Sequence, residues 1–260
     1  MLFAILKIMA KRILIANWKN YPDSIGRVGE ILDGLTKNSG VFKKVSTFIA
    51  PPLAYFESVS KRTKSFAHLA SQDIFVEKGT TTGAVGMDIL KSFGVRLSII
   101  GHSERRALGE TDGVVAEKIK IALKENIIPL VCIGESERDK EGEYLEFIRQ
   151  ELRLSLSGVK KKDDAKKLVV AYEPIWAIGM KARGTIVPED LAQMVIFIRK
   201  VLTDLYDRKT ADKISILYGG SVDHNNVNAL VRTRVNGFLV GRASLDPKKF
   251  VEIAKSLIKR

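Results

Sequence analysis

The sequence has a single cysteine, Cys132, among its 260 residues. One thiol cannot form an intramolecular disulfide, and a chain of this length can bury enough apolar surface without one. This favours a reducing compartment, and we predict a cytoplasmic protein. Low-complexity tracts are also absent, and 45% of the residues are hydrophobic, which excludes a disordered chain. The length fits one large α/β domain.

Long apolar runs are absent as well. No segment approaches the roughly 20 apolar residues that a membrane-spanning helix needs, so we expect no membrane partner. The apolar residues 2–6 are few, have no charged residue before them and lead into a basic stretch, which makes a poor signal peptide. We expect residues 1–11 to form an N-terminal extension. Met9 is an alternative start, and the first eight residues would then be an appendage.

The chain is strongly basic, with a formal net charge of +13. Such a charge attracts nucleic acid, anionic membranes or small anionic substrates, and does not by itself choose among them. The basic residues are spread along the chain in pairs and short runs, without interleaved aromatic residues. This distribution is typical of a solvated surface, and we expect no nucleic-acid partner.

A repeated alternation of short β-branched runs with longer segments of helical period fills the rest of the chain. The clearest helical segments are 188–206, which starts with a proline, and the stretch from 247 to the end. Eight strands are predicted, over residues 13–19, 45–51, 66–73, 95–102, 127–134, 168–174, 214–221 and 237–243.

Eight evenly spaced βα units favour a closed parallel barrel over a doubly wound open sheet. The first strand is followed by Ala16-Asn17-Trp18-Lys19, and not by the glycine fingerprint of a dinucleotide-binding fold. The predicted fold is therefore α/β, a single (β/α)₈ barrel of eight parallel strands over residues 12–260. In such a barrel the polar residues at the carboxyl ends of the strands face one shared pocket.

Three titratable residues stand where predicted strands end: Lys19 after the first, His102 after the fourth and Glu173 after the sixth. Each alone is explained as well by a solvated charge, a helix cap or an ion pair. Together they form a base, a hydrogen-bond donor and a cation, which is the set that proton abstraction beside a carbonyl needs.

The seventh and eighth strands lead into glycine turns, Tyr218-Gly219-Gly220-Ser221 and Val240-Gly241-Arg242. Backbone N–H groups of such turns converge on phosphate, and barrels frequently bind phosphate at this position.

The segment 174–179 after strand six is apolar although it lies in a predicted loop. A lid that closes over substrate would bury Ile178 and exclude water from Glu173. A loop packed permanently on the barrel rim is the alternative.

Six motifs occur in order along the chain: Asn17-Trp18-Lys19, Gly101-His102-Ser103-Glu104-Arg105-Arg106, Cys132-Ile133-Gly134-Glu135, Ala171-Tyr172-Glu173-Pro174-Ile175-Trp176-Ala177-Ile178-Gly179, Tyr218-Gly219-Gly220-Ser221-Val222 and Gly237-Phe238-Leu239-Val240-Gly241. In these motifs the chain resembles the triosephosphate isomerase family, from about residue 12 to residue 257. The resemblance implies an aldose–ketose isomerase that interconverts dihydroxyacetone phosphate and D-glyceraldehyde 3-phosphate through an enediolate, in glycolysis and gluconeogenesis. It also implies that neither a metal nor an organic cofactor takes part.

The resemblance implies a role for each site residue. Glu173 would be the catalytic base, His102 the neutral imidazole that polarises the carbonyl, and Lys19 the cation that favours the enediolate. Asn17 would orient the substrate. Backbone groups of four residues would hold the phosphate: Gly179, Ser221, Gly241 and Arg242. Behind these contacts we expect Glu104 to support Lys19, with Ser103 beside it, and Cys132 to pack near Glu173.

The family resemblance also implies a homodimer, or a tetramer built of such dimers, formed through the loop around Thr82. Ala84 stands where the family usually has an acidic residue, so one interface ion pair is in doubt. The segment 180–185 is longer than usual and changes the far hinge of the expected lid. Arg242 replaces a common glycine, and its guanidinium would add positive charge near the phosphate.

Two other functions fit part of this pattern. Another phosphate-binding barrel isomerase would use the same proton-transfer logic on a different substrate, but the motifs around His102 and Glu173 count against it. A binding or scaffold protein that had lost its activity would be expected to lack a catalytic residue. Asn17, Lys19, His102 and Glu173 are all present.

Overall fold

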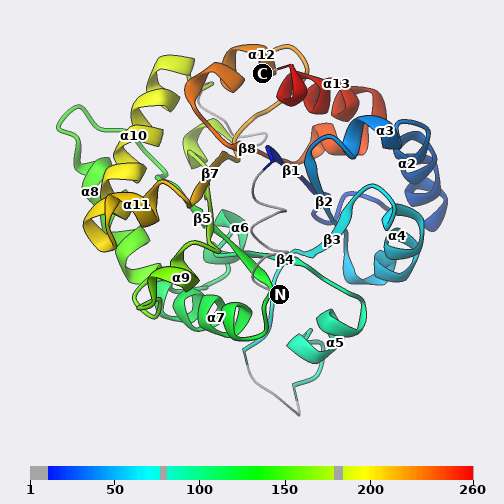
Figure 1. The fold of residues 1–260 in the computed structure, drawn as a ribbon, viewed down its shortest axis with the longest axis horizontal. Coiled ribbons are helices and arrows are strands. Elements are labelled where there is room, and N and C mark those ends of the chain that lie inside the picture. The colour runs from blue at the N-terminus through cyan, green and yellow to red at the C-terminus, as the bar shows by residue number, and fades with distance from the viewer. Residues whose placement is uncertain (1–10, 77–80, 179–183, 260) are drawn as a thin grey trace.

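The computed structural model describes residues 11–76, 81–178 and 184–259. Its centre is a ring of eight strands surrounded by helices (Figure 1). The strands are β1 (Ile13–Asn17), β2 (Ser46–Ala50), β3 (His68–Ser71), β4 (Leu97–Ile100), β5 (Ile128–Ile133), β6 (Val169–Tyr172), β7 (Ser215–Tyr218) and β8 (Gly237–Val240). Each strand pairs in parallel with the next along the chain, and β8 closes the ring against β1. The predicted (β/α)₈ barrel is confirmed.

The strands are shorter than the sequence pattern predicted. The predicted first strand ran to Lys19, whereas β1 ends at Asn17, and Lys19 has a left-handed φ of 47°. The predicted fourth strand ran to His102, whereas β4 ends at Ile100, before Gly101 with φ of 71°. These backbone conformations end the ladder, while Trp18, Gly101 and His102 just beyond the strands stay buried and prolong the buried pattern.

The core has two layers because alternate residues of each strand point to opposite sides of the barrel wall. Inside the barrel, Ile13 and Ile15 of β1 pack with Phe48, Leu130 and Leu239. Leu14 and Ala16 belong to the outer layer between strands and helices. A barrel buried on both faces explains why its strands read as continuous apolar runs.

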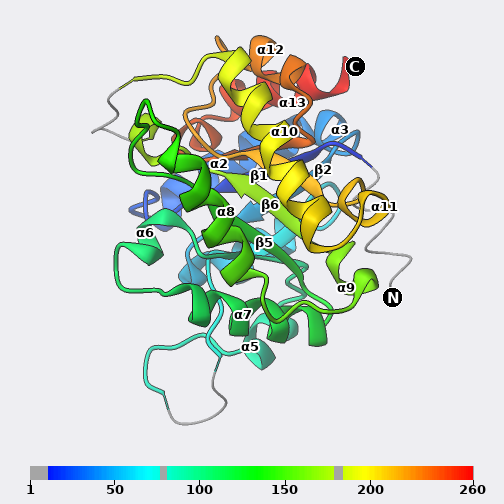
Figure 2. The same cartoon turned by 90° about the vertical axis from the view of Figure 1, so that its left-hand side faces the viewer.

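The helices cover the outside of the strand ring (Figures 1 and 2). They are α2 (Ile25–Lys37), α3 (Ser39–Phe42), α4 (Phe56–Thr63), α5 (Met87–Ser92), α6 (Ser103–Arg106), α7 (Asp112–Lys124), α8 (Glu143–Ser155), α9 (Lys162–Ala165), α10 (Pro188–Leu205), α11 (Arg208–Ala211), α12 (Val227–Leu230) and α13 (Pro247–Ile258), with short 3₁₀ turns at Leu53–Tyr55, Ile175–Ala177, Val231–Thr233 and Arg242–Leu245. The segment predicted over 188–206 is α10, and the final predicted helix is α13.

Local sequence signals start these helices. Pro188 and Pro247 stand in the first turns of α10 and α13, where a missing N–H costs nothing. Asp246 caps α13 by accepting hydrogen bonds from the N–H groups of Lys248 and Lys249. Within the described ranges, no helix combines the length and apolar character that crossing a membrane requires.

Candidate active site

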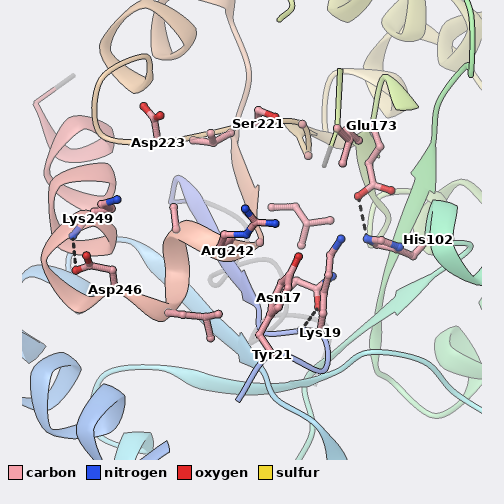
Figure 3. Close-up of a pocket in the computed structure, with 18 of the residues that line it drawn as sticks. Asn17, Lys19, Tyr21, His102, Glu173, Ser221, Asp223, Arg242, Asp246 and Lys249 are labelled. Atoms are coloured by element: carbon pink, nitrogen blue, oxygen red, sulfur yellow. Dashed lines mark hydrogen bonds and ion pairs between the residues drawn. The ribbon is translucent and has the colours of Figure 1, made fainter. Parts of the chain in front are cut away.

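A cavity of about 570 Å³ opens at the carboxyl ends of the strands. Its lining includes most of the residues that the sequence singled out: Asn17, Lys19, His102, Glu173, Ile178, Ser221, Gly241 and Arg242. In Figure 3, Glu173 and His102 lie on the right of this cavity and Ser221 at its top, with Arg242 in the middle and Asn17 and Lys19 below it. Gly179 lies outside the described residues.

Lys19 is held in its left-handed conformation by hydrogen bonds on both sides of its main chain. Its N–H donates to Asn17 Oδ1 at 3.1 Å, and its carbonyl oxygen accepts from Gln72 Nε2 at 2.8 Å. The ammonium Nζ lies 2.6 Å from Glu104 Oε1. These contacts hold a non-glycine residue in an unfavourable backbone region, which is typical of functional sites.

His102 faces the cavity and also caps a helix. Its Nδ1 accepts a hydrogen bond of 3.1 Å from the N–H of Glu104 in the first turn of α6. A ring nitrogen that accepts from an N–H carries no proton, so the imidazole is neutral and Nε2 holds its hydrogen. Nε2 lies 3.4 Å from Glu173 Oε1. His102 therefore caps α6 and also presents its Nε2 to the cavity.

Glu173 follows β6 and is only 3% exposed. Its Oε2 accepts a hydrogen bond of 3.4 Å from the N–H of Ser103. Cys132 is buried beside it. Burial above all, and next the charge of Glu173, raises the pKa of the Cys132 thiol well above its usual range. The thiol is therefore protonated and serves as packing, not as a nucleophile.

Two glycines make room for Glu173, a role that the sequence motifs did not indicate. A Cβ on Gly134 would lie 1.8 Å from the carbonyl oxygen of Glu173, and a Cβ on Gly219 would lie 2.8 Å from its Cγ. Both follow strands that neighbour β6 in the barrel. Their position just after neighbouring strands is the signal by which they could have been found.

The opposite side of the cavity is built from the turns after β7 and β8. Ser221 Oγ donates to the carbonyl oxygen of Ala177 at 2.9 Å, which connects the β7 turn to the segment after β6. Arg242 opens a 3₁₀ turn after Gly241, and its guanidinium lies 5.8 Å from the ring centroid of Tyr21. Arg242 is exposed and lines the cavity, so it stands at the cavity mouth.

Comparison with known proteins agrees with this geometry. The sequence profile of the triosephosphate isomerase family matches residues 12–257. A triosephosphate isomerase of Mycoplasma genitalium is 39% identical over 254 residues, which is 95% of this chain and 99% of the relative. The triosephosphate isomerase of Dictyoglomus thermophilum is 37% identical over 95% of this chain, and that of Carboxydothermus hydrogenoformans is 37% identical over 96% of it. Both matches cover the full length of the relative. The chain belongs to the triosephosphate isomerase family, a family of isomerases.

The segment after β6 in this member of the triosephosphate isomerase family is anchored at its near end. Glu135 Oε1 accepts hydrogen bonds from Trp176 Nε1 at 2.9 Å and from the Tyr172 hydroxyl at 2.7 Å. Arg138, which sequence reasoning missed, donates to the same oxygen at 3.1 Å and stacks on the Trp176 ring at 5.1 Å. Burial, and next the charge of Glu135, raises the pKa of the Tyr172 hydroxyl, so it stays a donor. Most of the longer segment 180–185 lies outside the described residues.

Proposed function

We propose that this chain interconverts dihydroxyacetone phosphate and D-glyceraldehyde 3-phosphate by proton transfer through an enediolate, in glycolysis and gluconeogenesis. The supporting observation is the arrangement of one buried carboxylate, one neutral imidazole and one ammonium around a single cavity. Glu173 and His102 lie 3.4 Å apart, and Lys19 lines the same cavity.

In the forward direction Glu173 removes a proton from the hydroxymethyl carbon of dihydroxyacetone phosphate. The electron pair of that C–H bond forms the C=C bond of the enediolate, and the carbonyl π electrons move to oxygen. His102 Nε2–H donates a hydrogen bond to this oxygen, and the charge of Lys19 stabilises the negative charge that develops on it. A proton then moves from the hydroxyl oxygen of the first carbon to the oxygen of the second, which leaves the negative charge on the first oxygen. Return of a proton from Glu173 to the second carbon breaks the C=C bond, and the electrons of the first oxygen form the C=O bond of the aldehyde, while Asn17 keeps the substrate oriented.

The phosphate is assigned to the other side of the cavity. The backbone N–H groups of Ser221, Gly241 and Arg242, with Gly179 from the segment after β6, would bind its oxygens. The guanidinium of Arg242 adds a positive charge at the cavity mouth. Fixing the phosphate some distance from the reacting carbons holds those carbons against Glu173.

Steady-state conversion of D-glyceraldehyde 3-phosphate by the purified protein tests this function, with Glu173→Gln alongside. The amide has nearly the same shape but cannot accept the proton, so we expect kcat to fall by about 10²–10⁴-fold. Glu117→Gln, an exposed carboxylate on α7 paired with Lys120, is the matched control and should keep the wild-type rate. A wild type inactive on triose phosphates but active on another sugar phosphate would favour the alternative barrel isomerase.

We also propose that the chain forms a homodimer, or a tetramer of such dimers, through the loop around Thr82. Thr82 is exposed, and a second cavity beside this loop is lined by the apolar residues Phe75, Met87 and Ile89 together with charged residues of α5 and α7 and their ends. The first half of the loop lies outside the described residues. Light scattering on the purified protein measures the assembly, and a monomer at micromolar concentration would contradict it. The cytoplasmic location stays a prediction.

A further inference from the structure

A buried ion pair lies behind the two side chains that face each other in the cavity, and none of the chemical steps above uses it. Arg106 Nε of α6 lies 3.2 Å from Glu151 Oε1 of α8. The Glu151 side chain is 6% exposed and that of Arg106 is 17% exposed. Burying two charges carries a large desolvation cost, so we ask what this ion pair does at this position.

Each partner of the ion pair also bonds to the main chain at the end of a strand. Glu151 Oε2 accepts a hydrogen bond of 2.9 Å from the N–H of Gly134, the residue after β5. Arg106 Nε also donates to the carbonyl oxygen of Gly101, the residue after β4, at 2.8 Å. The pair therefore ties the carboxyl ends of two neighbouring strands to each other.

These two points of attachment lie directly against the proposed catalytic groups. Gly101 immediately precedes His102 and has φ of 71°, so a rotation of its peptide would turn the imidazole. Gly134 packs on the main chain of Glu173, with the site of its missing Cβ only 1.8 Å from the Glu173 carbonyl oxygen. The missing side chain lets the main chains of Gly134 and Glu173 pack directly together, so a shift of Gly134 is passed on to Glu173.

We propose that Glu151 is a positioning residue of the isomerase reaction. Through the Gly134 N–H and through Arg106 it fixes Glu173 relative to His102, and its charge sets how the reaction responds to pH. This inference rests on the function proposed above and adds a residue to it that touches neither substrate nor reacting atoms.

The surroundings of Glu151 place its titration in a useful range. Burial raises the pKa of Glu151 to about 7. The charge of Arg106 and the hydrogen bond from the Gly134 N–H lower this pKa but do not cancel the effect of burial. Of the other charged groups that act on it, Asp112 of α7 and Glu173 both raise its pKa. The negative charge of Glu151 close to Glu173 therefore appears as the pH rises through about 7 and is lost below it.

The raised pKa of Glu151 also predicts how the stability of the fold depends on pH. The folded protein holds the Glu151 proton more tightly than the unfolded chain, whose carboxyl has its ordinary pKa of 4.5. The contribution of Glu151 to stability therefore decreases as the pH rises between about 4.5 and 7 and stays low above that. Replacing this carboxyl by an amide should leave the melting temperature at pH 8 unchanged or higher, because Arg106 keeps its contact with Asp112 at 2.6 Å.

The test compares Glu151→Gln and Glu151→Ala with wild type. The amide oxygen of Gln retains an acceptor for the Gly134 N–H and removes only the charge, whereas Ala removes both. In Glu151→Ala we expect kcat to fall by about 10- to 100-fold with KM little changed, because the reacting groups are misplaced while the phosphate side is intact. Glu151→Gln should recover part of kcat.

The pH profile supplies a readout that a purely structural role would not move. Glu151 carries its negative charge only above about pH 7, so Glu151→Gln should lose the change in kcat/KM that wild type shows near pH 7 and should match the wild-type profile at lower pH. Glu146→Gln on the same helix is the control, since Glu146 is exposed and pairs with Arg149 at 2.9 Å. It should match wild type in rate, profile and melting temperature.

Folded Glu151 variants with wild-type kcat and the wild-type change in kcat/KM near pH 7 would overturn the inference and leave the proposed function standing. A loss of melting temperature in Glu151→Ala with full kcat in the folded protein would overturn it as well, by reducing Glu151 to a structural residue. A wild type that does not isomerise triose phosphates would refute the proposed function itself, and this inference with it.

Discussion

The two sides of the cavity are built in different ways. On the side of β4, β5 and β6, His102 and Glu173 are buried and each has a specific hydrogen-bond partner. On the side of β7 and β8, glycine turns present the backbone, and the exposed Arg242 stands at the mouth. The first side needs particular side chains at particular distances, whereas the second mainly needs particular backbone conformations. Changes on the first side should therefore affect kcat, and changes on the second side KM.

After Glu173→Gln, the largest effect is expected for Glu173→Asp on the chemical side. The shorter side chain draws the carboxylate back from the substrate carbon by about one methylene, and a misplacement of about 1 Å costs on the order of 10²-fold in rate. KM should change little because the phosphate contacts are untouched. Steady-state kinetics measure both constants, and a variant with full kcat would remove Glu173 from the mechanism.

Gly219→Ala should have the next largest effect on kcat. It tests the division between the two sides of the cavity, because Gly219 belongs to the β7 turn but lies against Glu173. Its Cβ would stand 2.8 Å from Glu173 Cγ and push the base away, so we expect kcat to fall by about 10- to 100-fold. Gly29→Ala in α2, where a Cβ would meet nothing within 4 Å, is the matched control. A KM effect alone in Gly219→Ala would show that this turn serves only the phosphate.

Arg242→Ala should have a smaller effect, confined to binding. An exposed charge contributes about 0.2–1 kcal/mol, so KM should rise by up to about fivefold with kcat unchanged. The difference between variant and wild type should shrink at high salt, because screening weakens exposed charges. KM measured at low and at 0.5 M salt checks this, and a loss of kcat would assign Arg242 to the chemical side.

The smallest effect is expected far from both sides of the cavity. Gly29→Ala should stabilise the protein by about 0.5–1 kcal/mol, because alanine loses less backbone freedom than glycine when the helix forms. Denaturant titration measures the change. Lower stability would mean that the alanine methyl is not accommodated on this helix face.

The barrel was predictable from sequence because each strand is buried on both faces and reads as a short apolar run between helical segments. Asn17, Lys19, His102 and Glu173 were identified by their places at strand ends, and the structure brings them to one cavity. The predicted strands extend past the observed strand ends, because buried loop residues such as His102 prolong the pattern of buried positions.

The supporting residues were not predictable in the same way. Gln72 binds the main chain of Lys19 from more than 50 positions away in sequence, and Glu151 reaches Gly134 from the middle of a helix. A glutamate in an amphipathic helix looks like a surface residue in sequence, and only the packing of α8 on the barrel shows that its carboxylate is buried. Contacts of this kind depend on the assembled fold and leave no local signal.

The most direct test of the central claim follows hydrogen exchange during turnover in D₂O. If Glu173 removes a proton and an enediolate forms, wild-type protein should place deuterium from solvent on the reacting carbons of the triose phosphates, visible by NMR, and Glu173→Gln should not. Isomerisation by wild type without any deuterium entering the substrates, or unchanged exchange in Glu173→Gln, would contradict proton transfer by this residue.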